Sequence, residues 1–377
     1  MLERNMAYHL KVRLVVSLVT IGLLSATGTS IQRTPEMAKI TGQNYLKLMS
    51  PGINLGNTLE AIPNQTAWGN PIPNAAIMKS YKAAGFKSLR IPIAWSQYTD
   101  AKGKIDPKWM NHTKEVVKLA QSSGLYVLIN IHWDGGWLQP TYANRAETEA
   151  KFKNFWVQIA SAFKAFDHSI LFAGTNEVHV TNEYGPPTAE NAEVQNGFNQ
   201  IFVDTVRATG GLNSNRWLVV QSYNTDIDAA VKVNTKLPRV KAKNRLMMEV
   251  HYYSPFNFTL NEKSSIWQWG KNAKDPSAKD TWGDEDFVDG QFAKIKKEFV
   301  DKGIPVLLGE YGVGLKKNFP GMKAYQLDWD KYVTNSAYRH GMVPMYWDTG
   351  ADVGMFDRTT GKNREPGRVA AIVAAAK

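Results

Sequence analysis

Cysteine is absent from the sequence of 377 residues. Its absence excludes disulfide bonds, thiolate metal ligands and a cysteine nucleophile. A chain of this length buries enough apolar surface to fold without covalent cross-links. Exported proteins need not use disulfides, so this absence does not identify a cellular compartment.

The sequence also lacks an apolar run of the roughly 20 residues that a membrane-spanning helix needs. The N-terminal run, residues 14–24, is shorter; it follows Lys11 and Arg13 and precedes the small residues 25–28. This order of segments is typical of a secretory signal peptide, although a buried N-terminal helix would also be apolar. We therefore expect residues 1–30 to be a signal peptide and the protein to be secreted or periplasmic, without membrane contact after signal removal.

Long clusters of basic residues are missing as well. Lysine and arginine outnumber aspartate and glutamate by 45 to 34, which gives a formal net charge of +11. A basic excess can indicate binding to nucleic acid. Here the basic residues are scattered over the faces of expected helices, as on an ordinary solvated surface, so we expect no nucleic-acid partner.

The sequence does contain a repeated alternation of short apolar runs and helical patterns. The runs expected to form strands are residues 52–56, 87–92, 126–133, 170–177, 217–222, 245–252, 305–311 and 342–348. Four helical patterns end directly before a glycine, the usual stop of a helix, at residues 74–84, 111–123, 287–302 and 329–340. Eight strand–helix units predict an α/β fold, a (β/α)8 or TIM barrel.

An open doubly wound sheet is the alternative arrangement of the same units. Its nucleotide-binding form needs a glycine-rich turn that leads from the first strand into a helix. The sequence GINLG at residues 52–56 lacks the third glycine and the helix start. Because there is also no linker and no internal repeat, we expect one domain over residues 31–377 and no cofactor.

Ionisable and aromatic residues stand at the ends of six expected strands. The active site of a (β/α)8 barrel is built at the carboxyl ends of its strands. One such residue alone could be an ordinary surface residue, but six strand ends of this kind are hard to explain as core. The residues are Arg90, His132, Trp133, Asn176, Glu177, His251, Tyr253, Glu310 and Trp347.

Two of these residues, Glu177 and Glu310, decide the expected chemistry. Glycoside hydrolysis needs one carboxylic acid to protonate the leaving oxygen and one carboxylate on the other side of the anomeric carbon. The fourth and seventh strands lie on opposite sides of a barrel mouth, so the two glutamates can face each other. We expect Glu310 to raise the pKa of Glu177, and Arg90 to keep Glu310 ionised.

The remaining strand-end residues suit the binding of a sugar. Asn176 can hydrogen-bond a hydroxyl group next to the reacting carbon, and Tyr253 can orient a carboxylate. Histidines at 132 and 251 fit as hydrogen-bond partners, and Trp347 offers a flat apolar face to a pyranose ring. Further tryptophans lie in expected loops or at strand ends, among them Trp68, Trp133 and Trp137.

Together these motifs resemble glycoside hydrolase family 5, the cellulase family, over about residues 51–348. The motifs are GINLGN at 52–57, RIP at 90–92, NIH at 130–132, NE at 176–177, HYY at 251–253, GE at 309–310 and Trp347. The resemblance implies that Glu177 is the acid/base and Glu310 the nucleophile. It implies supporting roles for Arg90, His132, Asn176, His251, Tyr253 and Trp347. The sequences GNTLE at 56–60 and WGNP at 68–71 look like the endoglucanase branch, which implies substrate contacts by Asn57, Trp68, Trp133 and Trp137.

The chain departs from the family pattern at two positions. Val178 follows Glu177 where the family usually has proline, and Trp133 follows His132 where many members have a second histidine. Neither position touches the two carboxyl groups. The departures therefore bear on substrate preference more than on reaction type.

We therefore expect a secreted, monomeric endo-β-1,4-glucanase, or cellulase, which hydrolyses internal bonds of a β-glucan polysaccharide with retention and without a metal. A β-mannanase or xyloglucanase of the same family is the alternative. A metal-dependent barrel hydrolase usually has a His-x-His pair at the first strand, where this chain has Gly56 and Asn57. A non-catalytic carbohydrate-binding protein would not need two opposed glutamates.

Overall fold

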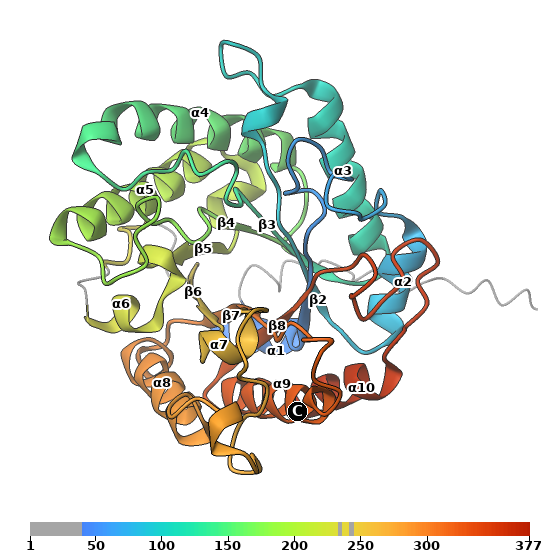
Figure 1. Cartoon of the computed structure of the whole chain (residues 1–377). Helices are drawn as coiled ribbons and strands as arrows, with labels where there is room; N and C mark the ends of the chain where they lie inside the picture. Colours follow the sequence, from blue (N-terminus) through green and yellow to red (C-terminus); the bar gives the residue numbers. More distant parts are fainter. Residues whose placement is uncertain (1–39, 233–235, 241–244) are drawn as a thin grey trace, which may run out of the picture.

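The computed structural model describes residues 40–232, 236–240 and 245–377. Eight parallel strands form a closed barrel in which each strand pairs with the next and β8 pairs with β1 (Figure 1). The strands are β1 (Gly52–Leu55), β2 (Ser88–Ile91), β3 (Tyr126–Asn130), β4 (Ile170–Ala173), β5 (Leu218–Gln221), β6 (Leu246–Tyr252), β7 (Val306–Tyr311) and β8 (Met342–Asp348). The predicted (β/α)8 barrel is confirmed, while the expected signal peptide lies outside the described residues.

Helices form a ring around the strands (Figure 1). They are α2 (Ala75–Ala83), α3 (Pro107–Ser122), α4 (Arg145–Phe163), α5 (Ala189–Ala208), α6 (Ile227–Lys232), α8 (Glu285–Glu298), α9 (Met322–Arg339) and α10 (Pro366–Ala375). Two short helices lie elsewhere, α1 (Gly42–Met49) and α7 (Phe256–Thr259). Among the described residues, none of these helices is long and apolar enough to cross a membrane.

The glycine stops expected from the sequence are present. Gly85, Gly124, Gly303 and Gly341 all have positive φ, the conformation that lets the chain leave a helix. Helix starts were less well predicted. The helix expected over 329–340 begins at Met322, because its first turns carry polar residues that do not mark a helix by their pattern. The loop expected over 178–196 is shorter, since Thr188 and Asn191 form a capping box that starts α5.

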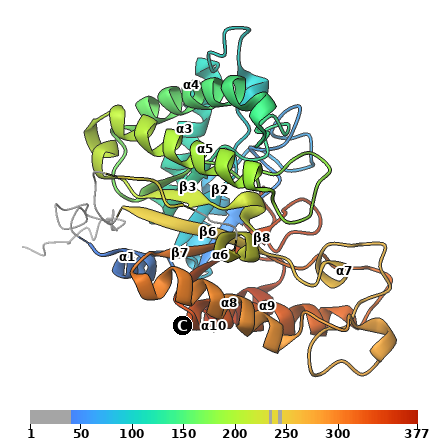
Figure 2. The same cartoon turned by 90° about the vertical axis from the view of Figure 1, so that its left-hand side faces the viewer.

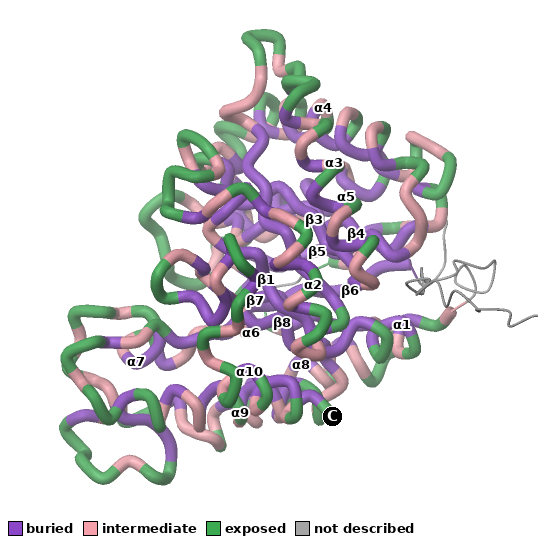
Figure 3. The backbone as a smooth tube through the Cα atoms, turned by 90° about the vertical axis from the view of Figure 1, so that its right-hand side faces the viewer, coloured by how far each residue is buried: buried purple, intermediate pink, exposed green. Residues whose placement is uncertain are grey.

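Apolar side chains fill one end of the barrel. Met247, Leu307, Met345 and other strand residues pack there with Tyr45 and Met49 of α1. Figure 2 shows α1 at this amino-terminal end of the strands, with α7 and its long flanking loops at the opposite end. Buried backbone runs through the strands, and the exposed segments are mostly outer loops and helix surfaces (Figure 3). The carboxyl ends of the strands are therefore left for polar residues.

Candidate active site

The expected site residues gather at the carboxyl ends of the strands, although several lie just beyond the strands themselves. Arg90, His251, Glu310 and Trp347 belong to β2, β6, β7 and β8. The others follow strand ends in loops: Asn57, His132, Asn176, Glu177 and Tyr253. A cavity of about 750 Å³ opens here, and both glutamates line it.

Glu310 is held on both of its carboxylate oxygens. Arg90 donates from Nη1 to Oε1 over 2.7 Å, and the Tyr253 hydroxyl donates to Oε2 over 3.1 Å. The Glu310 side chain is only 6% exposed, whereas that of Glu177 is 38% exposed. Glu310 is thus a fixed, buried carboxylate, and Glu177 faces the open cavity.

Glu177 is paired with a histidine. Its Oε1 lies 2.7 Å from Nδ1 of His251. One carboxylate oxygen of Glu177, one of Glu310 and one ring nitrogen of His251 all lie within 4.8 Å of one another. The backbone of Glu177 has φ of 46°, a left-handed conformation that few residues other than glycine adopt and that occurs often at functional sites.

The pKa of Glu177 is shifted in the direction opposite to the expected one. Burial, helped by the negative charges of Glu177 and Glu249, raises the pKa of Glu310 despite the opposing positive charges of His251 and Arg90. Burial also acts to raise the pKa of Glu177, but the hydrogen bond and charge of His251, with Arg90, bring it below the usual value. Arg90 acts on Glu310 in the expected direction, whereas the prediction for Glu177 missed the charge of His251.

The sequence predicted His251 as a hydrogen-bond partner but did not reveal its charge. Burial alone would lower its pKa, yet the carboxylates of Glu310, Glu177 and Glu249 raise the pKa of His251 to about 9. His251 is therefore an imidazolium at neutral pH. An imidazolium at this position donates from Nδ1 to Glu177 Oε1.

Glu177, His251 and Glu310 form the one group of three candidate metal ligands among the described residues. Their surroundings do not suit a cation. A protonated His251 has no free lone pair to coordinate a metal. The guanidinium of Arg90 already neutralises Glu310. The donor set fits acid–base chemistry better than metal chemistry.

The sugar-binding residues expected from the sequence separate into two groups. The rings of His132 and Trp347 stack with centroids 5.7 Å apart, and both line the cavity together with Asn57. Trp68 and Trp133 are 41% and 51% exposed in loops after β1 and β3, so their faces are open to a ligand. Neither of these two belongs to the residues that line the cavity.

Trp137 is placed differently. Its indole nitrogen donates to Asp134 Oδ2 over 2.7 Å, its ring packs edge-on against Phe155, and the Lys151 ammonium lies 4.3 Å above it. Asp134 in turn accepts the backbone N–H of Trp95 over 2.7 Å. The structure thus uses Trp137 to anchor the loop after β3, not as a face of the cavity.

Buried polar residues that the sequence did not single out hold the wall at Asn57. Glu60 accepts the backbone N–H groups of Asn57 and Thr58, the latter over 2.8 Å. The side-chain amide of Asn70 donates to the carbonyl oxygens of Asn57 and Thr349, over 2.8 and 2.9 Å. These contacts join the loops after β1 and β8. The sequence GNTLE contained Glu60, but nothing in it showed that the carboxylate turns back onto its own loop.

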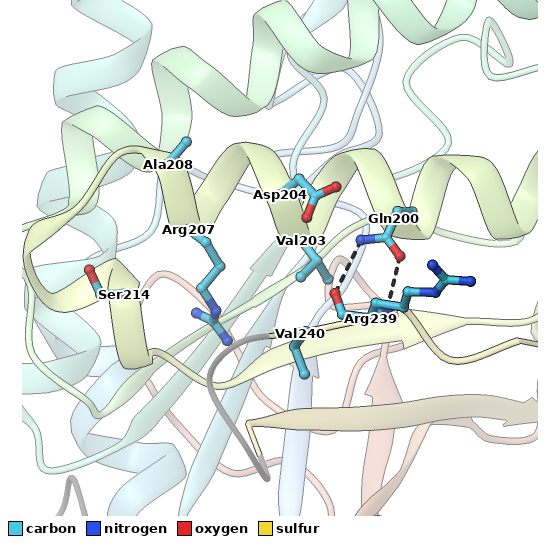
Figure 4. A pocket seen from close by; sticks show the side chains of 8 residues that line it. All are labelled: Gln200, Val203, Asp204, Arg207, Ala208, Ser214, Arg239 and Val240. Atoms are coloured by element: carbon cyan, nitrogen blue, oxygen red, sulfur yellow. Dashed lines mark hydrogen bonds between the residues drawn. The ribbon is translucent and has the colours of Figure 1, made fainter.

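A second cavity, of about 900 Å³, lies between α5 and the segment before β6 (Figure 4). Gln200 spans it at one side with two hydrogen bonds to the backbone of Arg239, of 2.9 and 3.2 Å. Asp204 is the one carboxyl group among its described lining residues. The described lining of this cavity therefore lacks the pair of carboxyl groups that glycoside hydrolysis needs, which the barrel mouth has.

Comparison with known proteins places the chain in a family. The family model described as cellulase (glycosyl hydrolase family 5) matches residues 52–353. The chain is 41% identical over 358 residues to a xyloglucan-specific endo-β-1,4-glucanase of Bacteroides ovatus, covering 89% of this chain and 70% of that protein.

Solved structures agree with this assignment. A Bacteroides ovatus family 5 xyloglucanase in complex with a XXXG heptasaccharide is similar with a TM-score of 0.86 and 40% identity, covering 89% of this chain and 77% of that one. A broad-specificity endoglucanase of Bacteroides salanitronis is similar with a TM-score of 0.84 and 36% identity, covering 89% of this chain and 95% of that one. The chain therefore belongs to the cellulase family, glycosyl hydrolase family 5, and is a glycoside hydrolase.

Proposed function

We propose that this enzyme is a retaining endo-β-1,4-glucanase, with Glu310 as nucleophile and Glu177 as acid/base. The observation that carries the proposal is the separation of their carboxylate oxygens, which is within 4.8 Å. Retaining enzymes hold their two carboxyl groups roughly 5–5.5 Å apart, whereas inverting enzymes leave roughly 6.5–9.5 Å for a water molecule. The short separation supports direct attack by a carboxylate.

In the first step a Glu310 oxygen attacks the anomeric carbon. The bond from this carbon to the leaving oxygen breaks, and the leaving oxygen takes a proton from Glu177. Arg90 and Tyr253 hold the two Glu310 oxygens in place, which limits the reorientation needed for attack.

The proton for this step comes from His251. Transfer from Nδ1 to Glu177 Oε1 across their 2.7 Å hydrogen bond turns the imidazolium–carboxylate pair into neutral imidazole and neutral acid. A bound sugar favours this transfer, because it excludes water and so disfavours separated charges. Glu177 then donates the proton into the cavity, toward which its side chain is open.

In the second step water attacks the anomeric carbon of the glycosyl ester on Glu310. Glu177, now a carboxylate, removes a proton from this water, and the sugar leaves with its original configuration while Glu310 is regenerated. Glu177 thus serves first as acid and then as base. It can do so because it exchanges a proton with the neighbouring His251.

Trp347 and Asn57 support binding of a glucan segment. The stacked pair of Trp347 and His132 offers an indole face at the floor of the cavity, which can pack on the C–H face of a sugar ring. We propose cellulose-type β-1,4-glucans as substrates, with xyloglucan as a second candidate. The 0.86 TM-score to a xyloglucanase that holds a XXXG heptasaccharide supports the second candidate.

The catalytic roles are tested by azide rescue. A Glu310→Ala variant supplied with azide and an activated aryl β-glucoside should form the α-glycosyl azide, and a Glu177→Ala variant the β-glycosyl azide. Glu298→Ala on α8, where the glutamate pairs with Lys302 on the surface, is the matched control and should keep wild-type activity. Full activity in Glu310→Ala would overturn the scheme.

The substrate is tested by measuring reducing ends released from carboxymethylcellulose, lichenan, xyloglucan, glucomannan and xylan. Activity on the first three supports an endoglucanase that tolerates branches. Activity confined to mannans would overturn the glucanase proposal.

We also propose that the enzyme is exported and acts as a monomer. The order of basic, apolar and small residues over 4–28 supports export. N-terminal sequencing of the exported protein and size-exclusion chromatography test both points.

A further inference from the structure

A third carboxylate lies beneath the catalytic pair. Glu249 belongs to β6, two residues before His251, and its side chain is completely buried. Both of its oxygens have partners. Oε1 lies 2.8 Å from Arg90 Nε and 3.2 Å from His251 Nε2, and Oε2 accepts the Gln221 amide over 2.9 Å. Glu249 thus contacts Arg90, which donates to Glu310, and His251, which pairs with Glu177.

Through Arg90, Glu249 controls the direction of a planar group. Nε lies 2.8 Å from Glu249 Oε1, an ion-pair contact without hydrogen-bond geometry, while Nη1 donates to Glu310 over 2.7 Å. Nη2 donates to Asn176 Oδ1 over 2.5 Å. Because a guanidinium is rigid and flat, the attraction of the Glu249 charge at one edge helps to hold the other two edges in place. Loss of the Glu249 contact would free Arg90 to turn away from the nucleophile.

Through His251, Glu249 controls where protons lie. A neutral imidazole carries a proton on one nitrogen only, whereas an imidazolium donates from both. Nε2 of His251 faces Glu249, and Nδ1 faces Glu177. A carboxylate beside each ring nitrogen favours the doubly protonated ring. Glu249 therefore helps to keep a proton on His251 Nδ1, from which Glu177 can receive it.

The neighbouring strand is adapted to this carboxylate. A Cβ atom added to Gly309 would lie 2.0 Å from Glu249 Oε1, which no side chain can tolerate. The register between β6 and β7 shifts at this point, pairing Val250 with Leu308 and His251 with Glu310. Gly309 is thus the extra residue of a bulge, a feature that often re-aims side chains next to active sites. The glycine of the Gly309–Glu310 motif makes room for Glu249.

We propose that Glu249 is a positioning residue of the catalytic centre, whose buried charge orients Arg90 and keeps His251 protonated, and thereby sets the pH range of activity. The proposal rests on the proposed function of Glu310 as nucleophile and Glu177 as acid/base. Glu249 itself does not reach the substrate, because it lies below His251 and is completely buried.

The charged groups around His251 determine in which direction the pH profile should shift. The groups that face it are Glu177 after β4, Glu249 on its own strand, Glu310 on β7, Arg90 on β2 and His132 after β3. Although burial raises the pKa of Glu249, Arg90 and His251 lower it to about 2, so its charge persists at working pH. Removing that charge lowers the pKa of His251.

The test is the pH profile of kcat/KM for Glu249→Gln. The acid limb reports protonation of Glu310, and the alkaline limb reports loss of the proton from the His251–Glu177 pair. The alkaline limb should move to lower pH by about one pH unit, because His251 loses one of its facing carboxylates. Misplacement of Arg90 should lower kcat by about 100-fold with little change in KM. An alkaline limb that does not move in a folded Glu249→Gln enzyme would overturn the proposal.

Two further variants separate positioning from structural damage. Glu249→Asp keeps the charge, so the alkaline limb of its pH profile should move less than that of Glu249→Gln. The aspartate variant can also be measured if the glutamine variant does not fold. Asp330→Asn removes a different buried carboxylate, one paired with Arg368 over 2.7 Å, and should lower the melting temperature without moving either limb. Equal shifts in Asp330→Asn would count against the proposal.

A measurement without substrate keeps the proposal independent of the reaction. The imidazole nitrogen resonances of His251, assigned by their loss in His251→Asn, should titrate at lower pH in Glu249→Gln than in the wild type. If the wild-type enzyme proved inactive on β-glucans, the proposed function would fail while this titration would still test Glu249. An unchanged titration would refute the role of Glu249 itself.

Discussion

Tyr253 donates its hydroxyl hydrogen to Glu310 Oε2 over 3.1 Å, on the oxygen that Arg90 does not contact. Burial and the Glu310 charge raise the pKa of Tyr253 well above its usual value, so the hydroxyl remains a donor at all working pH values. The hydrogen bond favours the ionised form of Glu310.

Tyr253→Phe should therefore raise the pKa of Glu310 and move the acid limb of the pH profile to higher pH. We expect kcat to fall about tenfold or more, since the nucleophile loses one of its two anchors. Tyr252→Phe is a matched control. The neighbouring Tyr252 packs against Phe292 and Trp329, and its buried hydroxyl has no hydrogen-bond partner among the described residues. A shift of the acid limb in Tyr252→Phe instead would contradict the assignment.

Two tryptophans that look alike in the sequence should behave differently when truncated. Trp347→Ala removes an indole face from the cavity, so kcat/KM on glucan should fall about tenfold or more while the melting temperature changes little. Trp137→Ala removes packing on Phe155 and a hydrogen bond to Asp134, so it should cost about 3 kcal/mol of unfolding free energy. Denaturant unfolding and steady-state kinetics on both variants distinguish the roles. The reverse pattern would mean that Trp137 binds the sugar.

The sequence predicted the barrel and the strand-end residues because both follow from short-range patterns. An apolar run that ends in a polar residue places that residue at the barrel mouth in any (β/α)8 fold. Such patterns do not predict the direction of a side chain in the loop that follows the strand. Asp134 has φ of 55° and the two glycines after it also have positive φ. After this turn Trp137 packs on Phe155 and donates to Asp134, and no residue pattern in the loop indicates these contacts.

Glu249 was missed for a different reason. A single glutamate inside an otherwise apolar strand looks like part of that strand, and its partners Arg90 and Gln221 come from β2 and β5. Only closure of the barrel brings these strands together around it. The same closure surrounds His251 with three carboxylates, and the resulting charge of His251 lowers the pKa of Glu177.

Glu60 should make the stability of the wild-type enzyme depend on pH. Burial raises the pKa of Glu60 from 4.5 to about 7, even though backbone N–H groups and Arg358 oppose the rise. The folded state then binds the proton more tightly than the unfolded state does. The contribution is therefore fully present below pH 4.5 and is lost as the pH rises to about 7, by about 3 kcal/mol in all.

Glu60→Gln removes this titration. The difference in unfolding free energy between wild type and variant, measured by urea unfolding at several pH values, should change in favour of the variant between pH 4.5 and 7. Other buried carboxyls such as Asp134 titrate in both proteins and cancel in the difference. A difference that is constant over this interval would show that Glu60 is not the titrating group.

Gly309→Ala should be strongly disruptive because its Cβ would overlap Glu249 Oε1. We expect a loss of about 1–3 kcal/mol of unfolding free energy, together with a fall in kcat, since either β7 or Glu249 must move. Gly290→Ala is the control. No atom of the described residues lies within 4 Å of its Cβ, and it sits inside α8, so it should stabilise the protein by about 0.5–1 kcal/mol. Shortening the opposing side chain in the double variant Gly309→Ala with Glu249→Asp should recover part of the lost stability, because the two residues share one space. Strictly additive losses, measured by denaturant unfolding of all four proteins in the cycle, would show that the glycine serves some purpose other than making room for the buried carboxylate.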